Sequence, residues 1–93
     1  MSEQATVGFS DLVLMLATMA AVHFGEMGDP VTGEKAKNMP AAGQMIDLLA
    51  LLQQKTQGNL EAEESQLLET ILYELRLRFI DASKDTGSRI ITP

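Results

Sequence analysis

A chain of 93 residues, 45% of them hydrophobic, has room for one hydrophobic core of useful size, so the sequence predicts a single folded domain and excludes a wholly disordered protein. Its net charge of -6 argues against nucleic acids and anionic membranes as partners, because both bind clustered lysine and arginine. The absence of cysteine excludes disulfides, zinc–thiolate sites and thiol catalysis.

The first predicted element is a helix that begins after Ser10 and ends before Gly25. A serine hydroxyl at the N-cap can accept a backbone N–H of the first turn, and glycine adopts the left-handed conformation common after the last turn. Between these ends almost every residue is apolar, and a helix that is apolar all round must be covered on most sides. We therefore expect this helix to pack also against a second copy of the chain.

A long connection, residues 25–38, follows this helix and exceeds the roughly 2–8 residues usual between packed helices. Asp29 and Pro30 suit the first two positions of a type I turn, and Gly33 suits the left-handed position that closes a small turn or hairpin. Such a connection does not force the first helix to be an antiparallel neighbour of the next one. It leaves open packing of the first helix onto a partner chain.

The second predicted helix follows Asn38, which is suited to cap it. Pro40 fits its first turn, where a missing N–H costs no hydrogen bond. Apolar residues then recur at helical spacing, and Gly58 ends the helix. The turn 57–59 is short, which predicts an antiparallel hairpin with the third helix.

The third predicted helix ends near Asp81 and carries one apolar stripe at i, i+3, i+4 spacing. The sequence after it lacks this periodicity, so we expect a single helical domain over residues 1–82 and a flexible C-terminal tail over residues 83–93. The predicted fold is therefore all-α. It is a three-helix domain with a long loop after the first helix and an antiparallel hairpin of the second and third helices, completed as a helical bundle by homodimerisation.

The only histidine lies at the end of the first predicted helix, with acidic residues of the long connection close behind it. Their spacing matches neither the paired histidines of H-E-x-x-H zinc sites nor the calcium-binding loop, and no serine lies in a recognisable nucleophile context. We therefore expect no catalytic residue, no metal site and no cofactor, and we interpret the histidine as one that faces carbonyls at a helix end. The five residues that define a possible interaction loop are His23, Glu26, Asp29, Thr32 and Glu34.

These observations favour a non-enzymatic helical interaction module that forms a homodimer or a higher homo-oligomer, with an unidentified protein partner. The alternative is a small-ligand-binding helical bundle with a pocket lined by methionine and leucine. The N-terminal stretch lacks the basic start of a secretory signal, and the apolar run 12–22 is shorter than the ~20 residues that span a bilayer. We therefore expect a cytoplasmic location.

Three stretches of the sequence carry a family resemblance. The first two are "VHFGEMGDPVTGE" and "IDLLALLQQKTQGNL". The third contains "EE", then "LLE", and ends with "LYELRLRF". They resemble a bacterial family of small helical proteins catalogued as a domain of unknown function, family 1844, over about Phe9–Phe79. The resemblance implies a cytoplasmic bacterial protein and supplies no activity. Glu61 stands where the family has threonine or serine, which weakens a capping box with Glu64. The stretch "NMPAAGQM" also departs from a pattern richer in lysine and leucine.

Overall fold

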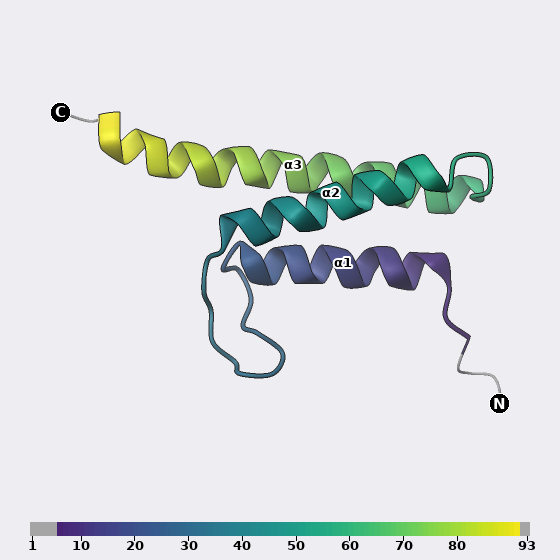
Figure 1. Cartoon of the computed structure of the whole chain (residues 1–93), viewed down its shortest axis with the longest axis horizontal. Coiled ribbons are helices and arrows are strands. Elements are labelled where there is room, and N and C mark those ends of the chain that lie inside the picture. The colour runs from purple at the N-terminus through teal and green to yellow at the C-terminus, as the bar shows by residue number, and fades with distance from the viewer. Residues whose placement is uncertain (1–5, 92–93) are drawn as a thin grey trace.

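A computed structural model describes the backbone of residues 6–91 and the side chains of residues 6–84. It contains three α-helices, α1 (Phe9–His23), α2 (Met39–Lys55) and α3 (Ala62–Ile91), and no strand within the described range. The helices lie side by side along the long axis of a molecule with extents of 59 × 32 × 16 Å (Figure 1). The predicted all-α, three-helix fold is confirmed.

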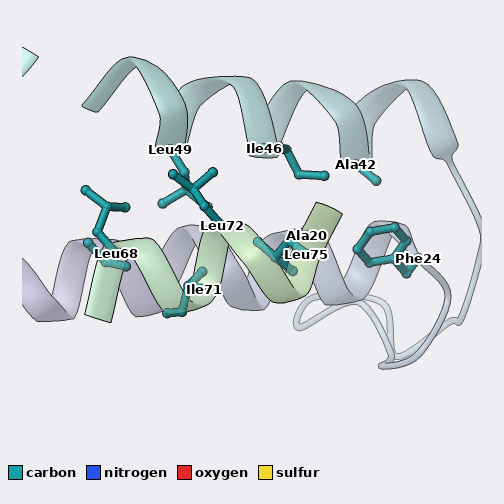
Figure 2. Packing of buried hydrophobic residues seen from close by; sticks show 10 residues of the cluster. Ala20, Phe24, Ala42, Ile46, Leu49, Leu68, Ile71, Leu72 and Leu75 are labelled. Carbon is teal, nitrogen blue, oxygen red and sulfur yellow. The ribbon is translucent and has the colours of Figure 1, made fainter. Parts of the chain in front are cut away.

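The core is a single cluster to which every helix contributes one face. Each helix contacts both of the others, so α1 packs on its own chain. In Figure 2, Leu49 of α2 meets Leu72 of α3, and Phe24 closes one end of the cluster. The buried members are Val13, Ala20, Phe24, Ala42, Ile46, Leu49, Leu68, Ile71, Leu72 and Leu75. Burial of these side chains is the main source of stability, at about 1.5–3 kcal/mol for each large one.

The start of α1 differs from the prediction that Ser10 is the cap. The helix begins at Phe9, and its N-cap is Gly8 in an extended conformation. The Asp11 carboxylate accepts the Gly8 N–H at 2.8 Å, which is the acidic half of a capping box. Because Asp11 reaches back in this way, the helix starts two residues earlier than a serine cap would place it.

The end of α1 is a Schellman motif built around Gly25. The Glu26 N–H donates to the Ala21 carbonyl at 3.1 Å and the Gly25 N–H to the Val22 carbonyl at 3.0 Å. Gly25 has φ of 83°, the left-handed conformation that the sequence predicts for it. The motif ends the helix and turns the chain into the long connection.

Replacing Gly25 with alanine is expected to lower the free energy of unfolding by about 1 kcal/mol, since a Cβ is strained at this φ. Its nearest neighbour would be Lys37 at 3.7 Å, an ordinary contact, so the cost comes from backbone conformation. Gly25→Asn is the matched control, because asparagine tolerates the left-handed region and should cost less. Urea denaturation followed by circular dichroism measures both; equal costs for the two variants would contradict this explanation.

The predicted start of α2 is confirmed, and the helix ends at Lys55, ahead of the turn that contains Gly58. The Asn38 side-chain carbonyl accepts the Ala41 N–H at 3.1 Å, and Pro40 stands in the first turn. After the helix, Gly58 has φ of 85° and reverses the chain toward α3. These are local features, and each follows from the chemistry of one residue.

The third helix is longer than predicted. It begins at Ala62, where the Glu64 carboxylate accepts the Glu61 N–H at 2.9 Å, so the acidic half of the capping box forms without threonine or serine. The expected end near Asp81 is wrong, because α3 continues to Ile91. Serine, lysine, aspartate and threonine each cost under about 0.7 kcal/mol in a helix, so loss of apolar periodicity does not by itself end one. Residues 92–93 of the predicted tail lie outside the described range. The flexibility of the tail over residues 83–93 stays a prediction.

Candidate functional site

The long connection is a closed loop rather than an extended bridge. The Asn38 N–H donates to the His23 carbonyl at 2.7 Å, so the chain returns to the end of α1 before α2 begins. In Figure 1 the loop hangs below the junction of α1 and α2. Its length therefore lets it fold back on itself, as in compact surface loops with adjoining ends. The loop does not carry α1 to a distant position.

A turn at the tip of this loop is organised by Asp29. Its carboxylate accepts the N–H groups of Val31 at 2.7 Å and Thr32 at 3.1 Å. The Asp29 N–H donates to the Glu34 carbonyl at 2.8 Å, and the Gly33 N–H donates to the Asp29 carbonyl at 2.7 Å. The Thr32 hydroxyl accepts the Glu34 N–H at 3.2 Å. The predicted Asp–Pro turn with a left-handed Gly33 (φ 77°) is confirmed.

The hydrogen bonds from Val31 and Thr32 lower the pKa of Asp29 below its ordinary value of 3.8, because they stabilise the ionised carboxylate. The contribution of this carboxylate to the turn is therefore present above pH 3.8 and is lost as the pH falls through the lower folded-state pKa.

We expect an NMR titration of the side-chain carboxyl to show Asp29 ionising below pH 3.8. Asp29→Asn keeps an acceptor oxygen and should preserve the turn, whereas Asp29→Ala should broaden or shift the amide resonances of Val31 and Thr32. A normal or raised pKa for Asp29 would contradict the hydrogen-bonded turn.

The base of the loop is joined to α3 by an ion pair. The Arg78 guanidinium lies 3.2 Å from the Glu26 carboxylate, and both side chains are nearly half exposed. An exposed pair of this kind contributes about 0–1 kcal/mol. The ion pair borders an open groove, to which α3 and the loop contribute further charged residues. The groove is lined by Phe24, Glu26, Lys37, Arg78, Asp81, Ala82 and Lys84.

The structure separates the five predicted loop residues into three places. Asp29, Thr32 and Glu34 share the turn, and Glu26 pairs with α3. His23 contributes its backbone carbonyl to closing the loop. Within the described part of the chain, no group of three or more histidine, cysteine or acidic residues is placed to hold a metal ion. The loop is held by hydrogen bonds within its backbone and by those that the Asp29 and Thr32 side chains accept from backbone N–H groups.

Sequence reasoning missed the α3 side of this region. Arg78 and Glu26 are 52 residues apart, so no spacing rule connects them. Lys37 and Lys84 reach the same groove from the loop and from α3. The sequence shows that Arg78 lies outside the apolar stripe of its helix. It cannot show which residue Arg78 pairs with, because that depends on how α1 and α3 pack.

A second candidate surface is the outward face of α1, formed by its exposed residues Asp11, Leu12, Leu14, Met15 and Thr18. Leu14 is 48% exposed and Met15 is 55% exposed. The Thr18 hydroxyl donates to the Leu14 carbonyl at 2.9 Å, so its hydrogen is used within the helix. No charged residue lies between Asp11 and the end of α1 at His23.

A third surface is the outer stripe of α3, formed by Tyr73, Leu77 and Ile80. These residues are exposed and lie at i, i+4, i+7 spacing, on the side opposite to the buried leucines of the same helix. Unlike the α1 face, the stripe is interleaved with exposed charges, namely Glu74, Arg76, Arg78 and Asp81.

An apolar hollow beside this stripe lies between α2 and α3. It is lined by Gly43, Ile46, Asp47, Arg76, Phe79 and Ile80, so it contains neither methionine nor leucine.

In the part of the chain that the structure describes, no helix is both long and apolar enough to span a bilayer.

Comparison with known proteins places the sequence in one family. The model of a family described as a domain of unknown function (DUF1844) matches residues 6–81, which include α1, α2 and most of α3. No curated protein and no solved structure matches the chain.

Proposed function

The chain belongs to the DUF1844 family, and from its surfaces we propose that it is a non-enzymatic helical interaction module that works as a homodimer. In this proposal α2 and α3 form an antiparallel hairpin, α1 packs across it, and two such units complete a helical bundle in the cytoplasm. The closed loop after α1 remains free at the edge of the dimer to meet a further protein.

The observation that carries the proposal is the apolar character of the outward face of α1. Leu14 and Met15 are about half exposed, and the hydroxyl of Thr18 is satisfied by its own helix. An exposed helical face of this kind is typical of a surface that is covered in the working assembly. Covering it removes apolar area from water, at about 25 cal/mol per Å².

For a second copy of the chain as the occupant, the α1 face is the one on which charge opposes pairing least. Each copy carries a net charge of -6, so two copies repel each other wherever acidic surfaces meet. The α1 face lacks charges beyond Asp11 and so lets two copies meet with little of this repulsion. The outer stripe of α3 is less suitable, because pairing it would desolvate the neighbouring Glu74, Arg76 and Asp81.

The size of the α1 face limits the affinity. Fifteen helical residues span about 22 Å, which makes a smaller contact than most obligate dimers have. We therefore expect a dimer that dissociates on dilution.

Sedimentation equilibrium or light scattering across a concentration series tests the proposal. The expected result is a mass of twice 10.1 kDa at high concentration, falling toward 10.1 kDa on dilution. The thermal midpoint should rise with concentration, because the dimer is stabilised by mass action. A monomeric mass throughout the micromolar range, with a constant thermal midpoint, would contradict it.

A further inference from the structure

We propose that a polar hollow at the turn between α2 and α3 binds a guanidinium group, the chemical group at the end of an arginine side chain. The turn lies at the opposite end of the molecule from the closed loop (Figure 1). The hollow has a volume of about 330 Å³, and its polar lining residues are Gln53, Thr56, Gln57, Ser65 and Glu69. Neither the α1 face nor the loop includes these residues, so the site goes beyond the proposed function and does not depend on it.

The α2 wall of the hollow favours a positively charged donor. Thr56 is the C-cap of α2, and its hydroxyl donates to the Leu52 carbonyl at 2.6 Å. Because the hydroxyl hydrogen is used in this way, Thr56 offers a ligand only the lone pairs of its oxygen. The last carbonyls of a helix lack partners within the helix and carry the negative end of its dipole, which stabilises a nearby cation.

The α3 wall adds a carboxylate. Glu69 is exposed, and it forms no ion pair with any residue that the structure describes. The positive end of the α3 dipole opposes a cation only weakly, because the Glu64 carboxylate already accepts the Glu61 N–H there at 2.9 Å. The hydroxyl of Ser65 is a further acceptor on this wall.

A guanidinium group suits these acceptors better than other cations. A single carboxylate is too few hard ligands for a metal ion, and the described residues include no group placed to hold one. An ammonium is a compact and strongly hydrated point charge, whereas a guanidinium is planar, less hydrated and able to donate five hydrogen bonds to acceptors on both walls. The volume lies near the lower limit of the roughly 300–1,000 Å³ of small-molecule sites, which suits one such group rather than a cofactor.

An NMR titration of the full chain with Nα-acetyl-arginine amide tests the proposal. We expect saturable shifts of the Thr56, Gln57 and Ser65 amide resonances, with a Kd on the order of 1 mM for so small a ligand. Nα-acetyl-citrulline amide has the same shape without the charge and should bind at least about tenfold more weakly, because the charge-assisted hydrogen bonds are lost. Linear shifts without saturation, or equal binding of the citrulline compound, would overturn the proposal.

Glu69→Gln should weaken the binding of Nα-acetyl-arginine amide at least about tenfold, since the amide keeps the shape of the side chain without its charge. Glu63→Gln is the matched control, because it removes an equally exposed carboxylate six residues earlier on α3 that does not line the hollow. Its Kd should stay within about twofold of the unmodified protein. Equal losses in the two variants, with unchanged circular dichroism, would show a general effect of charge and would overturn the site.

The same titration with free L-arginine and with a blocked Gly-Arg-Gly peptide identifies the source of the guanidinium group. Tighter binding of the peptide would support the site and assign it to an arginine of a partner polypeptide. Tighter binding of free arginine would support the site and assign it to a small molecule. A monomeric mass in sedimentation would overturn the proposed homodimer and leave this site intact, whereas failed titrations would do the reverse.

Discussion

Replacing Leu72 with alanine is expected to lower the free energy of unfolding by about 2–5 kcal/mol. Leu72 is 1% exposed and lies in the cluster shared by all three helices, opposite Leu49 (Figure 2). Truncation removes apolar contacts and leaves a cavity that rigid helices fill only in part. Since small domains have about 5–15 kcal/mol of stability in total, this variant should lose a large share of it.

Leu77→Ala is the matched control, because it makes the same chemical change five residues later on the same helix, where the leucine is 45% exposed. Its expected cost is under about 1 kcal/mol. Urea denaturation at a fixed protein concentration compares the two variants through their midpoints. Equal losses would mean either that α3 is rotated about its axis or that the outer stripe is buried in an assembly.

Features fixed by one residue and its neighbours could be predicted from the sequence. Gly25 and Gly58 adopt the left-handed conformation, and Asn38 caps α2 through its side chain. The turn at Asp29 follows from an aspartate that can accept nearby N–H groups and a proline with a fixed φ. In each case the hydrogen-bond partner lies within a few residues, so tertiary packing is not needed to find it.

The start of α1 and the end of α3 were harder to predict from the sequence, because several local signals compete there. Ser10 is a good cap, but Gly8 with Asp11 three residues later forms the start that the structure adopts. At the other end of the chain, no residue before Pro93 forbids a helix, so α3 extends past its last apolar stripe residue to Ile91. Apolar periodicity indicates which residues face the core. It is a weaker indicator of the residue at which the backbone stops being helical.

The candidate site depends on tertiary structure. The sequence located the loop but could not show that Asn38 returns to His23 or that Glu26 meets Arg78. Both contacts require the end of α1 to lie beside α2 and α3. The apolar excess of α1 was visible from its residues, whereas the side of the helix left uncovered, with Leu14 and Met15, was not.

Replacing Met15 with lysine is expected to weaken the proposed dimer by at least about 100-fold, or about 2.7 kcal/mol. Met15 is 55% exposed in the single chain, so the variant should remain folded. In the proposed dimer each introduced ammonium group would lose water at the α1 interface without an acidic partner opposite. The folded monomer therefore tolerates a change that the pair does not.

The mass of the variant by sedimentation, together with its helical content by circular dichroism, separates these effects. Val31→Lys is the matched control: it changes the net charge equally and replaces an apolar side chain that is 91% exposed, but in the loop rather than on α1. If the change in net charge alone controlled dimerisation, Met15→Lys and Val31→Lys would change the dimer mass alike. Each added lysine reduces the net negative charge of the chain, so both variants should then associate better than the unmodified protein. A selective loss of the dimer in Met15→Lys would assign the interface to α1, whereas an unchanged mass would remove α1 from it.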